Sequence, residues 1–295
     1  MTISSYADYL VSRGETVTSL GGIKWMNYYG ALIPSNAMPV YVDISRDDAV
    51  KLVKESNTLF LRYTTGPVES ETNWWYMVCR NYALSDVSGN TRSKIRRGLQ
   101  RLKIRPVTAA WLAKNGYDCH VRCYKRYKHA SPRTEDDFRF FMEGLDGYSI
   151  FDFWACCKSD KLVGYIICLR EKDGVFMHTI DISPEGLHDY SAYAMMHELL
   201  DHYVNGLGIP VSNGSRSIAH KTNMQDYLCK FGFEREYAYL HVVYRPVLRL
   251  LVDVLYPFRN VIRTLDVMAS FHKVSSLLFQ EEIVRTQTCL NLSYE

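Results

Sequence analysis

The segment Asn223–Pro246 constrains the fold more than any other part of this 295-residue chain. Leu228 and Phe231 are spaced to share one face of a helix, and Gly232 can take the left-handed conformation that ends a helix. The alternating residues that follow, Tyr237–Tyr244, are typical of a strand. The segment therefore predicts a helix, a glycine turn and a closing strand.

Three strand-like runs lie upstream, at Ile150–Cys157, Leu162–Arg170 and Val175–Ile182. Their connections are short and polar, which is typical of antiparallel hairpins. A helix is predicted from about Tyr190 to Tyr203, and a strand at Ile209–Ser212. We expect the strands 162–170 and 175–182 to be adjacent and antiparallel, with this helix packed on one face of their sheet.

The first 87 residues form a separate region in this interpretation, with strands predicted at Tyr28–Ile33, Pro39–Val42 and Thr58–Tyr63 and a helix at Arg46–Glu55. Ser45 or Asp43 could cap that helix. A polar joint containing glycine, residues 86–90, leads into a basic helix. Further helical segments are predicted at 108–129 and 134–144.

The basic helix lies in a stretch without acids: none occurs between Asp86 and Asp118, whereas eight Lys and Arg do. At helical spacing, Lys94, Arg97 and Arg101 share one face. This face is a candidate anion site for a pyrophosphate, a nucleotide sugar or the phosphates of a tRNA. The alternative is a solvated helix face. Nucleic acid is the less expected partner, because the net charge of the chain is only +3.

Two of these motifs resemble a known family. Lys230-Phe-Gly-Phe233, between a helix and a strand, is similar to the turn that commonly ends the folding unit of the GNAT superfamily of acyltransferases. Thr91-Arg-Ser-Lys-Ile-Arg-Arg-Gly98 resembles the helix that the Fem-type branch carries ahead of its second acyltransferase unit. Together the resemblance covers roughly residues 50–246.

The resemblance implies an α/β (α+β) protein with a GNAT-like acyl-CoA N-acyltransferase fold, in which a mixed, mainly antiparallel sheet is flanked by helices. We expect an N-terminal α/β part at 1–87, which the Fem-type branch would make a degenerate GNAT-like half. The acyltransferase domain would follow at 88–246, and a helical extension at 247–295.

In the GNAT fold the two central strands splay apart and acyl-CoA lies in the opening, its pyrophosphate on backbone N–H groups at the start of the next helix. The corresponding segment is Ile182–Ser191. The usual glycine-rich loop is absent, and Glu185 and Asp189 bring negative charge there. Fem-type members also depart from that loop, and some use aminoacyl-tRNA. The candidate cofactor contacts are Gly186, Leu187, His188, Tyr190 and Ser191.

Candidate catalytic residues lie on the strand Val175–Ile182. If its side chains alternate, His178 points to one face and Asp181 to the other. An imidazole with a pKa near ~6.5 suits a general base, so His178 is the first candidate and Asp181 the second. Either residue could instead be structural.

The familiar GNAT general acid is a Tyr four residues before the glycine of the turn. Leu228 occupies that position here, and Tyr227 lies one step away. Tyr227 is therefore the candidate acid. Polar groups for the substrate are offered by Asn213, Ser215 and Arg216, although this short run is equally typical of a turn.

The cysteines do not predict a metal centre. Cys119 and His120 are adjacent, and no second Cys-x-x-Cys pair completes a tetrahedral set with Cys123. We expect no metal, and thiols that fill core positions.

Residues 247–285 extend past the acyltransferase unit and are apolar for most of one helix. They could pack on the core, bury themselves in a second subunit as a homodimer, or lie on an anionic membrane face. The N-terminus lacks the features of a signal peptide, so a cytoplasmic location is expected, with peripheral contact at the inner membrane face as one option.

The sequence thus predicts an acyltransferase that moves an acyl group from acyl-CoA, as cosubstrate, to an amine or hydroxyl of a cell-envelope sugar or precursor, either a small molecule or a lipid-linked sugar. Two alternatives remain: an aminoacyl-tRNA-dependent transferase, which would take tRNA as a partner, and a non-catalytic GNAT-like binding module.

Overall fold

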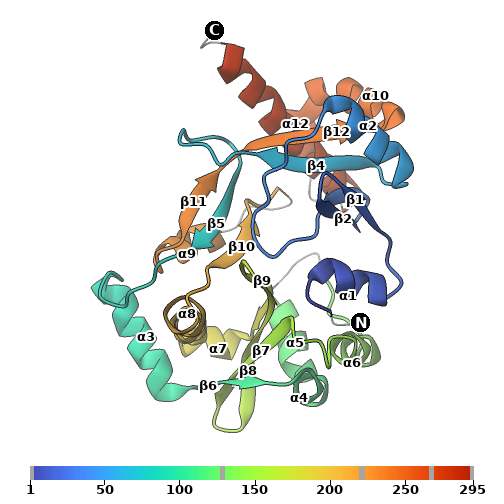
Figure 1. Cartoon of the computed structure of the whole chain (residues 1–295). Helices are drawn as coiled ribbons and strands as arrows, with labels where there is room; N and C mark the ends of the chain where they lie inside the picture. Colours follow the sequence, from blue (N-terminus) through green and yellow to red (C-terminus); the bar gives the residue numbers. More distant parts are fainter. Residues whose placement is uncertain (1–2, 127–129, 219–222, 266–268, 293–295) are drawn as a thin grey trace. The chain divides into compact units, whose positions relative to one another are not determined.

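The computed structural model describes residues 3–126, 130–218, 223–265 and 269–292 (Figure 1). The chain forms two compact units. Unit 1 comprises Met1–Tyr6, Val78–Gly214 and Asp226–Glu234, and unit 2 comprises Ala7–Met77, Ser215–Gln225 and Arg235–Glu295. The C-terminal residues therefore belong to the same unit as most of the first 77 residues.

The sheet of unit 1 is built on an antiparallel meander of β6 (Lys103–Val107), β7 (Phe151–Lys158), β8 (Lys161–Glu171) and β9 (Gly174–Ile182). β10 (Val211–Ser215) pairs with β9 in parallel. The strand order is β11-β5-β10-β9-β8-β7-β6, where β5 (Trp75–Cys79) and β11 (Glu234–Tyr237) are strands in which the chain passes from one unit to the other. The prediction that strands 162–170 and 175–182 are adjacent and antiparallel is confirmed.

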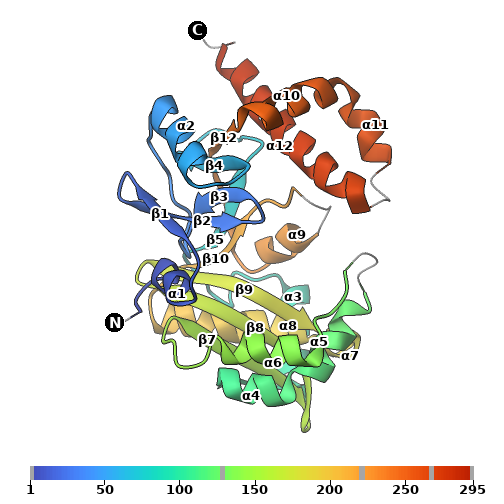
Figure 2. The same cartoon turned by 90° about the vertical axis from the view of Figure 1, so that its right-hand side faces the viewer.

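Helices cover both faces of this sheet (Figures 1 and 2). One face carries α3 (Gly89–Arg101), α7 (Pro184–His188) and α8 (Ser191–Leu200), which continues as the π-helical turn η1 (Asp201–Gly206). The other face carries α4 (Ala109–Asn115), α5 (Tyr117–Tyr124) and α6 (Glu135–Glu143). The short α9 (Met224–Cys229) precedes the predicted turn, and Gly232 there has the positive φ, 81°, that the sequence required.

Apolar side chains at helical spacing fix α8 on the sheet. Met195, Met196, Leu199 and Leu200 are buried. Gly164 of β8 leaves room for them, since a Cβ there would lie 3.4 Å from the sulfur of Met195. Residues 108–129 were predicted as one helix, but α4 ends and α5 begins at Gly116. Positions 127–129 of that prediction lie outside the described residues.

Unit 2 contains a five-stranded sheet in the order β1-β2-β3-β4-β12. Its strands are β1 (Val17–Leu20), β2 (Ile23–Tyr28), β3 (Ala31–Pro34), β4 (Phe60–Thr65) and β12 (Tyr239–Tyr244). All neighbours pair antiparallel except β3 and β4, which are parallel because α2 (Arg46–Glu55) crosses between them. The predicted helix 46–55 is confirmed, with the Ser45 hydroxyl accepting the Asp48 N–H at 3.1 Å.

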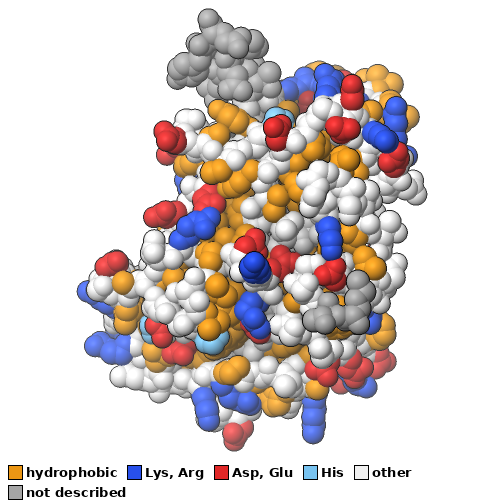
Figure 3. All heavy atoms as spheres, viewed as in Figure 1, with side chains coloured by type: hydrophobic (Ala, Val, Ile, Leu, Met, Phe, Trp, Pro, Cys, Tyr) orange, Lys and Arg blue, Asp and Glu red, His pale blue; other side chains and the backbone are white. Residues whose placement is uncertain are grey.

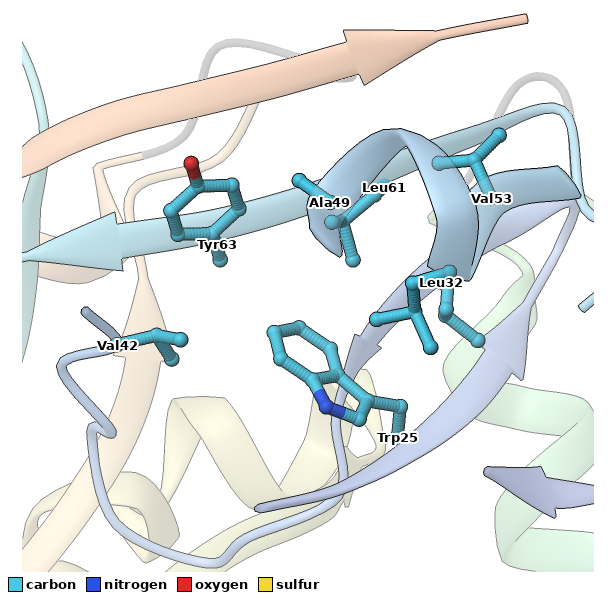
Figure 4. Close-up of a cluster of buried hydrophobic side chains, with 8 residues drawn as sticks. Trp25, Leu32, Val42, Ala49, Val53, Leu61 and Tyr63 are labelled. Carbon is cyan, nitrogen blue, oxygen red and sulfur yellow. The ribbon is translucent and has the colours of Figure 1, made fainter. Parts of the chain in front are cut away.

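The core of unit 2 lies between this sheet and α2 (Figure 4). Trp25 of β2 and Leu32 of β3 are buried against Leu52 and Val53 of the helix, together with Leu61 of β4. The remaining helices are α1 (Tyr6–Ser12), α10 (Pro246–Leu255), the 3₁₀ turn η2 (Tyr256–Phe258), α11 (Arg259–Thr264) and α12 (Ala269–Leu292). None of the helices in the described part of the chain has the length and apolar character needed to cross a bilayer.

Candidate active site

β9 and β10 pair over only two residues. Val175 and Phe176 face Val211 and Ser212, and beyond them the described residues of β9 pair with β8 alone. A local turn ends the pairing: Gly214 has a φ of 78°, and its N–H donates to the Ser212 hydroxyl at 3.0 Å. The splay of the two central strands that the sequence resemblance implied is therefore present, and beyond Phe176 the edge of β9 that faces β10 has no strand partner among the described residues.

A β-bulge lies at this splay. Ile167 of β8 faces Thr179, whereas the next residue, Cys168, faces Met177, so His178 is the extra residue of β9. His178 Nδ1 lies 3.0 Å from the Thr179 hydroxyl. Neighbouring side chains in a regular strand point to opposite faces. The regular alternation predicted for this strand is thus wrong at His178.

The His178 ring is half-buried and lies edge-on to two aromatic rings, those of Tyr6 and Phe176, each with its centroid 6.3 Å away. Loss of hydration lowers the pKa of His178 below its usual value, and the nearby positive charge of Arg133 lowers it further. The imidazole is therefore neutral at pH 7, which is the form that a general base requires.

Asp181 belongs to a buried cluster under α5. Tyr165 lies directly opposite it on β8 and donates its hydroxyl to Asp181 Oδ2 at 2.5 Å. His120 Nδ1 lies 2.7 Å from the same oxygen, and His120 Nε2 accepts the Arg133 backbone N–H at 3.2 Å. Because Nε2 accepts, the ring proton sits on Nδ1 and is donated to Asp181. All three side chains in this network are buried.

His120 was not predicted as a site residue. The sequence places it in a helix beside two cysteines, and only the fold brings it to Asp181, 61 positions away. Cys119 and Cys123 are buried, and their mutual hydrogen bond raises the pKa of the Cys123 thiol. Within the described ranges, no group of three or more His, Cys, Asp or Glu side chains could hold a metal ion.

The predicted cofactor loop folds into α7 and uses most of its own amides. Ser183 caps this helix, its hydroxyl accepting the Gly186 N–H at 3.2 Å, while the amides of Leu187, Asp189 and Tyr190 donate to carbonyls inside the loop. A Cβ on Gly186 would lie 2.6 Å from the Val163 carbonyl oxygen, so glycine is required there for packing on β8. The side chains of Leu187 and His188 are exposed.

The start of α8 is different, because no side chain caps its first turn. Tyr190, in the left-handed conformation with a φ of 63°, turns the chain into this helix. The Ser191 hydroxyl is fully buried and makes no hydrogen bond with the described residues. Uncapped amides at a helix start favour an anion. This turn, more than the preceding loop, has the character of a phosphate site.

α3 lies directly on that turn and brings cations to it. A Cβ on Gly98 would lie 2.8 Å from the Tyr190 carbonyl oxygen, so the two helices approach closely only because this residue is glycine. Arg97 and Arg101 each lie 5.8 Å from the centroid of the Tyr190 ring, and Lys94 lies 5.0 Å from that of Tyr193. The basic face of α3 that was predicted as an anion site thus lies next to the first turn of α8. We call this surface the α3–α8 corner.

The Asp189 carboxylate beside this corner is compensated. It accepts a hydrogen bond from Lys158 Nζ at 2.6 Å and lies 3.3 Å from Arg101 Nη1. The hydrogen bond from Lys158 lowers the pKa of Asp189, and Arg101 acts in the same direction. The negative charge that the sequence placed near the expected diphosphate is therefore balanced by two cations.

Tyr227 packs against α8 and has a partner for its hydroxyl, which donates to the Ala192 carbonyl at 2.8 Å. Burial raises its pKa well above the usual value. Its ring contacts Tyr193 and Phe231, with centroids 5.4 and 5.2 Å away, and Leu228 is fully buried. The hydroxyl hydrogen of Tyr227 is therefore engaged with the backbone in this structure.

The predicted substrate residues fall in different units. Asn213 is a half-buried residue of β10 in unit 1, whereas Ser215 and Arg216 belong to unit 2. The Arg216 guanidinium donates to the Asn73 carbonyl at 2.6 Å and lies 4.3 Å from the centroid of the Trp75 ring and 5.2 Å from that of Phe279. Its charge is thus held by contacts within unit 2.

Comparisons with known proteins bear on the fold. The sequence matches no protein-family model and no curated protein. Among solved structures, the chain is similar to the C-terminal DUF2156 domain of a protein from Agrobacterium fabrum named as a lysylphosphatidylglycerol synthetase, at a TM-score of 0.53 and 13% identity over 86% of this chain and 92% of that one. It is also similar to FemX, at a TM-score of 0.55 and 9% identity over 84% and 93% of the two chains.

At such low identity these similarities concern the fold. They confirm the predicted GNAT-like architecture, with mixed sheets flanked by helices, and its resemblance to Fem-type proteins.

Proposed function

We propose that this protein transfers an acyl group from a phosphate-bearing donor, acyl-CoA, to an amine or hydroxyl of a cell-envelope sugar or its precursor. The observation that carries the proposal is the bulged His178, which lies where β9 and β10 cease to pair. A neutral imidazole beside an unpaired strand edge combines a proton acceptor with backbone hydrogen-bond donors. The GNAT-like fold supports this assignment.

His178 would act as the general base. In the tautomer whose Nδ1–H donates to the Thr179 hydroxyl, the lone pair on Nε2 is left for the acceptor. As Nε2 takes a proton from the attacking amine or hydroxyl, the acceptor's nitrogen or oxygen bonds to the acyl carbon. The carbonyl oxygen becomes an oxyanion, which amides on the free edge of β9 can stabilise. When the carbon–sulfur bond breaks, the imidazolium returns the proton to the leaving thiolate.

The α3–α8 corner would bind the phosphates of the donor. It combines uncapped helix amides with the cations Lys94, Arg97 and Arg101. β9 leads from His178 towards this corner, and the five residue steps from His178 to Ser183 span about 16 Å of extended strand. An extended thioester arm along β9 would therefore connect the two parts of the site.

One observation favours a second candidate, an aminoacyl-tRNA-dependent transferase. Arg92 and Arg96 are exposed on α3, and neither has an acidic partner among the described residues. No acid occurs in the sequence between Asp86 and Asp118. A polyanion larger than a diphosphate could use this additional charge. The engaged Tyr227 hydroxyl and the buried Leu228 instead favour the third option, a binding module without catalysis.

A thermal-shift screen with CoA, acetyl-CoA, nucleotide sugars and tRNA separates these options. A ligand at 100 times its dissociation constant adds ~2.7 kcal/mol to the free energy of unfolding. Stabilisation by CoA and acetyl-CoA would support the proposal, whereas stabilisation by tRNA alone would favour the second candidate. If no phosphate-bearing donor stabilises the protein, the proposed donor site is wrong.

A further inference from the structure

A stripe of exposed apolar side chains runs along α10, η2 and α11 in unit 2. Within α10 its members recur at steps of three or four residues, except the adjacent Leu250 and Leu251, so they share one face of that helix, and the same spacing recurs from Phe258 to Leu265. They are exposed by 46–83% of their surface and comprise Val247, Leu250, Leu251, Val254, Phe258, Val261 and Leu265. We call this face the α10–α11 stripe. Large apolar side chains gathered on one exposed face mark an interaction surface.

The core does not account for the stripe. The opposite side of the same segment is already packed, because Val252 and Ile262 are buried against Tyr244 of β12 and Leu278 of α12. Of the three options that the sequence left open for this segment, packing on the core thus applies only to its inner side. The stripe itself faces outward.

The charged residues of the segment flank the stripe and are turned towards α12. Arg249 pairs with Asp253 at 2.7 Å and with Glu281 at 3.1 Å. Arg259 and Arg263 share Glu282, at 3.4 and 2.6 Å. The stripe itself therefore contains no charge, but arginines border it. Over the face of the molecule that Figure 3 shows, charged and hydrophobic side chains are interspersed.

The charge balance of the segment is positive even when its partners on α12 are included. Residues 245–265 contain four Arg and one Asp, and α12 adds Arg285, Glu281 and Glu282, so five Arg minus three acids gives a net charge of +2. An apolar face bordered by arginines matches the interfacial plane of a membrane that contains anionic lipids. A second copy of the chain is a poorer match, because a twofold contact would bring the same arginine-rich segments together.

We propose that the α10–α11 stripe binds an anionic lipid surface, with its apolar side chains in the headgroup region and its flanking arginines near the lipid phosphates. Pro257 separates the two helices, so the segment presents two short apolar faces in place of one long helix. This attachment needs no spanning helix. It is also independent of the acyl donor, so its test is separate from that of the proposed function.

Vesicle sedimentation tests the proposal. The full chain is mixed with vesicles of phosphatidylcholine alone or of phosphatidylcholine with 30% phosphatidylglycerol, beside the double variant Leu250→Glu/Val254→Glu. Both positions are more than half exposed, so the variant should fold, which circular dichroism checks. We expect the wild type to sediment with the anionic vesicles. The partition coefficient of the double variant for these vesicles should be lower by a factor of about ten or more.

A matched control is Val11→Glu, which places the same charge at a position in α1 of unit 2 that is 54% exposed and lies off the stripe. It should bind vesicles as wild type does. The proposal is overturned if wild type stays in the supernatant with anionic vesicles, or if the double variant binds equally well. A third result would also overturn it: light scattering finds that the wild type is a dimer and the double variant a monomer, and neither protein binds vesicles. In that case a second copy of the chain covers the stripe.

Discussion

The carboxylate of Asp181 on β9 accepts the hydroxyl hydrogen of Tyr165, the residue directly opposite on β8. His120 of α5 donates to the same oxygen, and Phe138 of α6 lies 5.0 Å, centroid to centroid, from the imidazole. The cluster therefore ties α5 and α6 to the strand that carries His178. A buried carboxylate with two donors is stable only while both remain. We infer that Asp181 supports the geometry of the site more than it takes part in proton transfer.

Tyr165→Phe tests this inference. The substitution removes one hydrogen bond to a buried carboxylate and should lower the free energy of unfolding by about 1.5–3 kcal/mol. Urea denaturation measures the loss. Tyr117→Phe is the control, since Tyr117 also packs on Phe138 and its hydroxyl makes no hydrogen bond with the part of the chain that the structure describes. Equal stability of the two variants would show that the Asp181 cluster contributes little.

The α3–α8 corner should contribute to ligand binding more than to stability. In the single variants Arg97→Gln and Arg101→Gln, the free energy of binding the donor should weaken by about 1.5–3 kcal/mol for each charged hydrogen bond lost to a donor phosphate. This corresponds to a rise in Kd of roughly 10- to 100-fold in each variant. The melting temperature should change little, because both arginines are exposed and Asp189 keeps Lys158.

Arg96→Gln removes the same charge from another face of α3 and is the matched control. Titration calorimetry with CoA should separate it from the other two variants. An equal loss of affinity for CoA in all three variants would indicate a diffuse electrostatic effect. A loss of stability with unchanged affinity would show that the arginines of the corner have a structural role.

Tyr227→Phe distinguishes a catalytic acid from a packing residue. Because the hydroxyl donates to the Ala192 carbonyl, its loss should cost about 0.5–1.5 kcal/mol of stability. The rate of acyl transfer per folded molecule should hardly change. A fall in that rate by ~10²–10⁴, with little loss of stability, would instead identify Tyr227 as the acid.

The pH dependence of turnover should reflect the environment of His178. Since burial and Arg133 both disfavour the imidazolium, the pKa lies below its usual value, and activity should be lost only as pH falls through a midpoint below ~6.5. Arg133→Gln removes the positive charge, raises the pKa and should move this midpoint to higher pH. A profile of kcat/KM against pH measures both, and an unmoved midpoint in the variant would exclude His178 as the titrating group.

Local signals in the sequence were enough to predict several elements. The helix 46–55 has its cap one residue before it and its apolar residues at helical spacing, and the strands of the meander are separated by short polar turns. The predicted strand Tyr28–Ile33 is wrong at Tyr29 and Gly30, because it crosses the hairpin between β2 and β3. Tyr29 and Gly30 form that turn with φ of 51° and 86°. Tyr is not typical of a turn position with positive φ, so the sequence did not indicate the turn. No strand forms at Pro39–Val42 either.

The site depends on contacts that a sequence does not contain. The bulge at His178 appears only when β9 is paired with β8, so alternation along one strand could not reveal it. His120 reaches Asp181 through the packing of α5 on the sheet. The basic face of α3 was visible as a charge pattern, but its place over Tyr190 follows from the close approach at Gly98.

Hydrolysis of the donor tests the proposed acyl transfer most directly, because it needs no knowledge of the acceptor. Water can replace the acceptor at the same base, so wild type should slowly release free thiol from acetyl-CoA, measured with a thiol reagent. His178→Ala should fold normally and lose this activity by ~10²–10⁴. Thiol release by the variant at the wild-type rate would contradict the assignment of His178. A wild-type protein that releases no thiol from acyl-CoA would contradict the proposed function itself.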